Sequence, residues 1–193
     1  MARLPYAFRA WLFLQALDDI VAAYRAAAKA HSSRPEEIEA EVRRRLGIGP
    51  DDPFPDRNDD DEEDPVGRLY DEAGEMEERA GRGAHLVRKA FLIALFHHWE
   101  RHCNSELGRT KYGHPKSWLG ERGKSAHAKE ILELERAANC AKHGPGHSCQ
   151  DLFKTSRSLF PKITDATKAT ERALVIDEAT LERFFDVVRK AAS

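Results

Sequence analysis

Apolar residues recur at helical spacing through most of this chain, whereas no alternating β-strand pattern of useful length occurs outside a short stretch at 173–177. The clearest helical segment, 4–30, contains no glycine and no proline after Pro5. One side of that segment carries five apolar residues, Leu14, Leu17, Ile20, Val21 and Tyr24. The pattern therefore predicts an all-α fold, a helical bundle with long antiparallel helices.

Start and stop signals define a second helix between 33 and 47. Ser33 is placed to cap this helix, Pro35 favours its first turn, and Glu36 would complete a capping box with Ser33. Gly47 is a typical residue just past a helix end. We therefore expect the second helix to end at Gly47.

The chain from residue 66 onward carries the remaining helical patterns. A long helix is expected over 66–107, with a break near Gly81 and Gly83. Its second half, 85–104, is the most apolar helix of the chain. The other helices are expected over 125–143, over 148–159, and from Asp177 or Glu178 onward.

Charge is distributed unevenly along the chain, whose formal net charge is −2. The segment 51–64 holds nine acidic residues and one base, whereas 109–129 holds six Lys and Arg residues and one acid, Glu121. We expect the acidic loop, 50–66, to be disordered. The basic loop is a candidate footprint for a phosphate backbone, and the alternative for both loops is a solvated segment without a ligand.

A length of 193 residues suits one well-buried domain. We expect a single domain over 1–193, with N-terminal helices over 1–49, the acidic loop over 50–66 and the core over 67–193. The longest apolar run falls far short of the ~20 residues that cross a bilayer, so no membrane span is expected. Three cysteines, Cys103, Cys140 and Cys149, are a sparse, odd set that predicts reduced thiols in a cytoplasmic protein.

Three polar residues near the end of the 125–143 helix form the sharpest local feature. Asn139 follows Arg136 by three residues and precedes His143 by four, so all three share one helix face. Arg136 offers a fork of donors suited to phosphate, Asn139 can orient a ligand, and His143 can exchange a proton near neutral pH. The alternative is a plain helix end, where His143 caps carbonyls and Arg136 pairs with Glu133 or Glu135.

An arginine separated by six residues from a histidine, on the last long helix of a small bundle, resembles the HEPN superfamily. The context around the motif, 138–144 followed by Ser148, Leu152 and 159–161, is similar to a subset of HEPN-like proteins. The segment 95–100 also resembles the long helix that precedes the motif in that superfamily. The resemblance spans about 86–192.

The resemblance implies a metal-independent endoribonuclease, without a cofactor, that cleaves RNA in the cleft of a homodimer. Arg136 would contact phosphate, His143 would act as acid or base, Asn139 would orient, and Glu100 would position Arg136 or His143. The RNA-binding residues would be Arg109, Lys111, Lys116, Arg122, Lys124 and Lys142. Many such proteins are toxins or antiviral (phage defence) effectors, so a neutralising antitoxin or another regulatory partner is also expected.

Two other hypotheses use the same residues. A non-catalytic HEPN-like module would bind RNA, a nucleotide or a protein without cutting RNA. A zinc site would draw its ligands from two clusters, His97, His98, His102 and Cys103, and Cys140, His143, His147 and Cys149. Neither cluster contains the paired Cys-x-x-Cys spacing that makes a zinc prediction strong.

Overall fold

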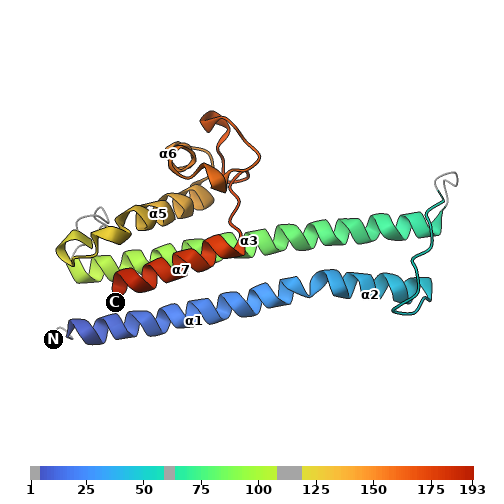
Figure 1. Ribbon diagram of the computed structural model, residues 1–193, viewed down its shortest axis with the longest axis horizontal. Helices are drawn as coiled ribbons and strands as arrows, with labels where there is room; N and C mark the ends of the chain where they lie inside the picture. The colour runs from blue at the N-terminus through green and yellow to red at the C-terminus, as the bar shows by residue number, and fades with distance from the viewer. Residues whose placement is uncertain (1–4, 59–63, 108–118) are drawn as a thin grey trace. The chain divides into compact units, whose positions relative to one another are not determined.

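The computed structural model describes residues 5–58, 64–107 and 119–193, and all regular structure in these ranges is helical (Figure 1). This confirms the predicted all-α fold. The chain divides into two compact units. We call 1–24 together with 87–193 the core unit, and 25–86 the acidic unit.

The core unit contains the first part of α1, the second part of α3, and the three C-terminal helices. The bounds of these elements are α1 Tyr6–Ser32, α3 Pro65–Leu107, α5 Ala128–His143, α6 His147–Thr155 and α7 Glu178–Ala192, with short 3-10 turns at Ser125–His127, Arg157–Leu159 and Ala166–Lys168. The expected start of α7 is confirmed, because the Asp177 carboxylate caps it by accepting a hydrogen bond from Thr180 N at 2.8 Å. Residues 173–177 form no strand.

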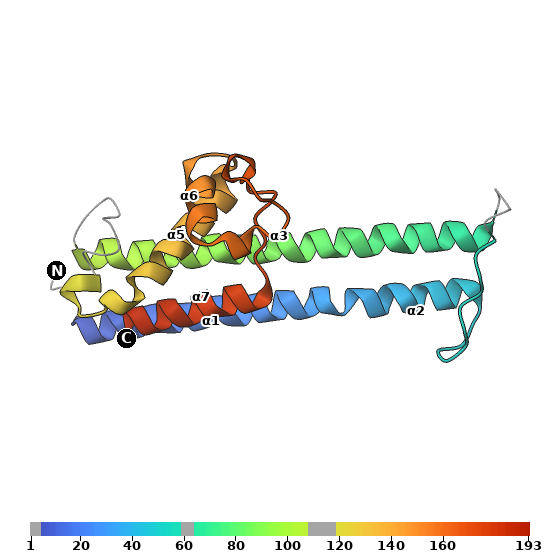
Figure 2. The same ribbon diagram turned by 45° about the horizontal axis from the view of Figure 1, so that its top comes forward.

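Large apolar side chains fill the interior of the core unit, where Tyr24, Trp99, Phe184 and Phe185 are almost completely buried. Figures 1 and 2 show α7 beside the first part of α1, and the Tyr6 hydroxyl donates to Ala192 O at 3.3 Å across this contact. α5 is joined to α7 by a bidentate ion pair between Glu133 and Arg183, at 3.0 and 3.1 Å. The core unit thus holds α5 on a packed apolar base.

The acidic unit consists of the end of α1, α2 (Arg34–Leu46) and the first part of α3. α2 ends as predicted, because Gly47 takes the left-handed conformation (φ 66°) that a glycine adopts without strain. α2 and α3 are joined by the Arg45–Glu72 ion pair, at 2.7 Å. Among the buried hydrophobic side chains of the described ranges, Val42 is the only one that belongs to this unit.

Part of the acidic loop is ordered, which differs from the predicted disorder. Phe54 packs edge-on against Tyr70, with the ring centroids 6.2 Å apart, and the Tyr70 hydroxyl donates to Pro55 O at 2.7 Å. Arg57 forms an ion pair with Asp71 at 2.9 Å. The prediction considered the charge of the segment and overlooked its aromatic anchor. Residues 59–63 lie outside the described residues.

Two local predictions about the helices are wrong. Ser33 has helical backbone angles and makes no capping bond. Its single hydroxyl proton is shared between Ala30 O at 3.3 Å and Glu37 Oε1 at 3.1 Å, and no box forms with Glu36. α3 runs from Pro65 to Leu107 without the expected break at Gly81 and Gly83. Its continuity fits the cost of a helical glycine, about 1 kcal/mol, which destabilises a helix without necessarily breaking it.

None of the helices, within the residues that are described, is long and apolar enough to span a bilayer.

Candidate functional site

The three polar residues of the candidate site lie on α5, where the helical register places them on one face. Arg136 and Asn139 are half-buried, and His143, the last residue of the helix, is exposed. The opposite side of α5 carries the buried residues Ile131, Leu134 and Ala138. Burial of that side directs the polar face away from the core.

Arg136 is held by α6 rather than by an acid. Its Nη1 donates to the Thr155 hydroxyl at 3.3 Å. Glu133, one of the two acids considered as its partner, pairs with Arg183 instead. Within the described residues Arg136 forms no ion pair, so the alternative in which an acid neutralises it within a salt bridge does not hold.

Glu135, predicted only as an acid that could pair with Arg136, lies beside Arg136 on α5. Burial raises the pKa of its carboxyl group; the charge of Arg136 opposes this shift, and that of Glu100 adds to it. Its Oε2 atom is buried without a hydrogen-bond partner among the described residues. The electrostatic effects place the charges of Glu100 and Arg136 near one carboxyl group.

Glu100, predicted as a positioning residue, lies on α3 and contacts a histidine of its own helix. His97 Nδ1 and Glu100 Oε2 are 3.0 Å apart, and both side chains are partly exposed. The charges of Glu100 and Arg136 both act on the Glu135 carboxyl group, with opposite effects on its pKa. His97 is a further neighbour of Glu100, and the i, i+3 spacing on α3 indicates this contact. A direct contact of Glu100 with His143 stays a prediction.

The turn after His143 is fixed in two ways. Gly144 has φ 75°, a conformation that strains other residues, and a Cβ there would lie 3.4 Å from Glu171 Oε2. A disulfide joins Cys140 near the end of α5 to Cys149 in the first turn of α6, and both cysteines are fully buried. The covalent bridge closes the turn that carries His143.

This disulfide corrects the prediction of reduced thiols. Cys103 is the free cysteine, and it is buried, which raises the pKa of its thiol strongly. The prediction failed because it counted three cysteines over the whole chain. It did not consider that Gly144 and Gly146 allow a turn tight enough to bring Cys140 and Cys149 together.

The basic residues predicted to bind RNA lie at several places. Arg109, Lys111 and Lys116 lie outside the described residues. Arg122 lies over the Tyr6 ring at 3.8 Å and pairs with Glu106, and Lys124 donates to Lys190 O at 3.3 Å. Both precede α5, whereas His143 ends it about 22 Å farther along the helix axis. Lys142 is exposed beside His143.

The two histidine–cysteine clusters do not form a metal centre in the described ranges, where no three His, Cys, Asp or Glu residues are placed to hold an ion. His98 and His102 instead stack on Phe13, with ring centroids at 4.2 and 4.3 Å. In the second cluster, Cys140 and Cys149 are joined to each other. The i, i+4 spacing of the two histidines therefore serves packing.

No protein-family model matches this chain, and the searches of curated proteins and of solved structures found no match either. The resemblance to the HEPN superfamily stays a prediction from the residues of the chain.

Proposed function

We propose that this chain is a metal-independent endoribonuclease of HEPN type, working as a homodimer. The observation that carries the proposal is the face of α5 on which Arg136, Asn139 and the exposed His143 lie together. Arg136 has the charge and the donors for a phosphate, and His143 is open to a substrate.

The chemistry needs one proton removed and one delivered. A base takes the proton of a ribose 2′-hydroxyl, and the oxygen attacks the adjacent phosphorus. The bond to the 5′-oxygen breaks, and this leaving group receives a proton, which yields a 2′,3′-cyclic phosphate and a 5′-hydroxyl end. His143 of one protomer and His143 of its partner would divide these two roles, with Arg136 stabilising the charge on the phosphate.

The surroundings of Arg136 support this role. Among the described residues no acid forms an ion pair with Arg136, and burial raises the pKa of the neighbouring Glu135 carboxyl group. Thr155 accepts a hydrogen bond from one nitrogen of the guanidinium group, and the helical register places Arg136 on the face that it shares with His143. A guanidinium group that forms no ion pair among the described residues suits a phosphate-binding role.

The test is cleavage of a mixed RNA pool by the purified protein in excess EDTA. Wild type is expected to cut and to leave cyclic phosphate ends, detected by mass spectrometry. His143→Ala and Arg136→Ala are expected to lower the rate about 100-fold or more. His147→Ala is the matched control, because His147 is also exposed and begins α6, off the face. Cleavage by folded His143→Ala at the wild-type rate, or none by folded dimeric wild type, contradicts the proposal.

A non-catalytic module that binds RNA, a nucleotide or a protein is the second candidate. The observation that favours it is that α5 presents one histidine on this face, whereas the reaction requires two proton-transfer steps. Sedimentation, which measures the oligomeric state, decides together with the cleavage assay between the ribonuclease and the non-catalytic module. A monomer that binds RNA without cutting it supports the module.

The cellular role that accompanies this proposal is that of a toxin or antiviral effector, because many proteins of the HEPN superfamily have that role. A neutralising antitoxin or another regulatory partner belongs to this proposal. Expression of wild type and of His143→Ala in separate cultures tests this toxic role directly. Growth arrest by wild type alone is the expected result, and equal growth contradicts the role.

A further inference from the structure

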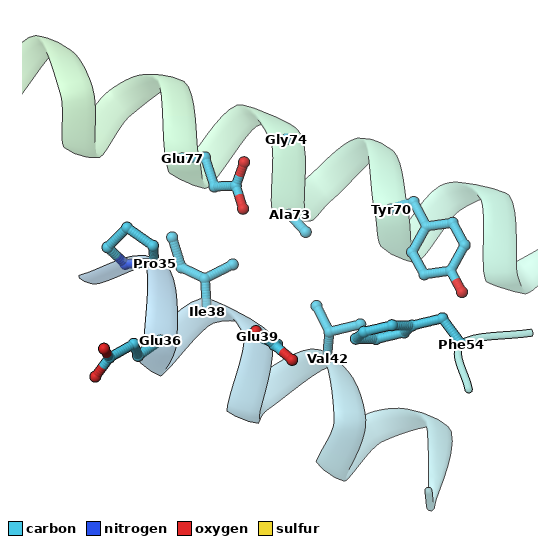
Figure 3. A pocket seen from close by; sticks show the side chains of 10 residues that line it. All are labelled: Pro35, Glu36, Ile38, Glu39, Val42, Phe54, Tyr70, Ala73, Gly74 and Glu77. Atoms are coloured by element: carbon cyan, nitrogen blue, oxygen red, sulfur yellow. The ribbon is translucent and has the colours of Figure 1, made fainter. Parts of the chain in front are cut away.

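An apolar groove lies between α2 and the first part of α3, entirely within the acidic unit (Figure 3). Its volume is about 460 Å³. Ile38 and Val42 extend from α2 toward α3, and Ala73 and Gly74 face them (Figure 3). Phe54 lies beside Val42 and closes one end of the groove.

The two small residues keep the α3 side of the groove open. A Cβ added to Gly74 would meet no atom within 4 Å. A glycine in a helix costs about 1 kcal/mol relative to alanine, and here the space that it leaves is not filled by any described residue. The closed end is rigid, because Arg43 lies over the Phe54 ring at 4.2 Å and donates to Asp52 O and Gly49 O.

Three glutamates, Glu36, Glu39 and Glu77, line the groove. Glu39 is neutralised by Arg43 at 2.9 Å. Glu36 and Glu77 have no ion-pair partner among the described residues, and Glu77 extends from α3 into the gap (Figure 3).

The other acids on these helices do have partners. Within the described parts of α2 and of α3 up to residue 86, the ion-paired acids are Glu37, Glu39, Glu41, Asp71, Glu72, Glu75 and Glu78. The two unneutralised carboxylates of these helices therefore both lie at the apolar groove.

We propose that this groove binds a basic amphipathic helix of a partner protein. Two flanking helices and an apolar floor suit a third helix that inserts apolar residues at i, i+3 or i+4 and i+7. The span from Pro35 to Val42 is about 10 Å, which is two helical turns of the partner. Lys or Arg residues beside that apolar stripe pair with Glu36 and Glu77.

Charge decides against other occupants. The acidic unit contains 18 Asp and Glu against 10 Lys and Arg residues, so it carries a formal charge of −8. A second copy of the same unit would bring another −8 against this groove. Anionic lipid and RNA are repelled in the same way. A cationic helix is the occupant that gains from both the apolar floor and the carboxylates.

The experiment measures binding of a synthetic 16-residue helix of leucine and lysine, arranged with one apolar face, to the full chain by fluorescence anisotropy. Gly74→Phe places a phenyl ring at the groove, from a position where an added Cβ meets no atom within 4 Å, and it is expected to weaken binding at least 10-fold. Gly81→Phe is the matched control, because its Cβ also meets nothing within 4 Å but Gly81 does not line the groove. It is expected to leave binding within twofold of wild type.

A second pair of variants separates local from general charge. Glu36→Lys with Glu77→Lys is expected to weaken binding at least 10-fold. Glu75→Lys with Glu78→Lys, with the same change in charge but outside the groove, is expected to weaken it much less. The same peptide with glutamate in place of lysine is expected not to bind.

Four results overturn the proposal. The first is no binding of the lysine peptide, and the second is equal binding of the glutamate peptide. The third is an equal loss of affinity in Gly74→Phe and Gly81→Phe, or in the Glu36 and Glu77 double variant and the Glu75 and Glu78 double variant. The fourth is self-association of the chain that Gly74→Phe abolishes, which assigns the groove to a second copy.

Discussion

Each of the two units of this chain is stabilised internally by a different kind of interaction. The core unit buries nearly all of the large apolar side chains that are buried in the described ranges, and it carries a formal charge of +6. The acidic unit carries −8 and holds its helices together through exposed ion pairs such as Arg45–Glu72. Exposed ion pairs contribute about 0–1 kcal/mol each, far less than a buried aromatic ring.

The difference separates two kinds of surface. A site that must position Arg136 and His143 needs a rigid base, and burial beneath α5 supplies it. A groove that receives a partner helix needs apolar surface left uncovered, and the sparse burial of the acidic unit leaves it. Four changes in stability, from the largest expected effect to the smallest, test this contrast.

Equivalent truncations in the two units should have unequal costs. Phe184 is 0% exposed in the core unit, and Phe54 is 39% exposed in the acidic unit. Phe184→Ala is expected to lower the free energy of unfolding by about 3–5 kcal/mol, because it leaves a cavity. Phe54→Ala is expected to lower it by about 1–2 kcal/mol. Urea denaturation followed by circular dichroism measures both changes. Equal losses of stability in the two variants would contradict the difference in packing between the two units.

Loss of the disulfide should act on the core unit alone. Replacing Cys140 and Cys149 with alanine is expected to lower the stability by about 2–3 kcal/mol, because the bridge closes a loop of about ten residues in the unfolded chain. Hydrogen exchange should increase in 128–155 and remain unchanged in 25–86.

Thiol counting checks the bridge itself. The unfolded, unreduced protein should react with one equivalent of maleimide, at Cys103, and reduced protein with three. Three equivalents without reductant would restore the original expectation of reduced cysteines.

Acid should weaken the core unit through its buried histidines. Burial lowers the pKa of His102 to about 4, and it also lowers the pKa of His98, so both side chains are neutral in the folded state near pH 7. Between pH 6.5 and pH 4 the imidazole of His102 binds a proton more readily in the unfolded chain than in the folded chain. The free energy of unfolding therefore falls as the pH falls. The expected loss from His102 between pH 7 and pH 4.5 is about 2 kcal/mol.

His102→Phe keeps the stacking on Phe13 and removes the titrating ring, so its stability should depend less steeply on pH. Parallel urea titrations at pH 4.5, 5.5 and 7 compare the slopes. Identical slopes for wild type and variant would show that His102 does not carry the acid sensitivity.

Much of the fold could be predicted from local signals. The bounds of α2 follow from Pro35 and Gly47, and the start of α7 follows from Asp177, because capping and backbone preferences act within a few residues. The register of Arg136, Asn139 and His143 on α5 follows from helical spacing.

The rest depends on contacts between residues distant in the sequence. Thr155 holds Arg136 from another helix, and packing buries the Oε2 atom of Glu135, so no local pattern indicates either role. Phe54 orders part of an acidic loop only because Tyr70 and Arg43 lie where α2 and α3 bring them. The disulfide required the geometry of the turn between α5 and α6 in addition to a count of cysteines.

The smallest expected effect compares one ion pair from each unit. Glu106 in the core unit accepts hydrogen bonds from Arg9 at 2.7 and 2.8 Å, and its side chain is 2% exposed. Burial opposes its ionisation, but the hydrogen bond and charge of Arg9 outweigh burial and hold the pKa of Glu106 below its ordinary value. Glu78 pairs with Arg82 on an exposed turn of α3 at 2.9 Å.

Glu106→Gln is expected to lower the stability by about 1–2 kcal/mol, because Arg9 and Arg122 lose their shared carboxylate but remain partly in contact with water. Glu78→Gln is expected to change it by less than about 0.5 kcal/mol. Added salt should reduce the effect at Glu78 further and leave most of the effect at Glu106, because buried pairs are screened less. Equal losses in the two variants would mean that burial does not distinguish the ion pairs of the two units.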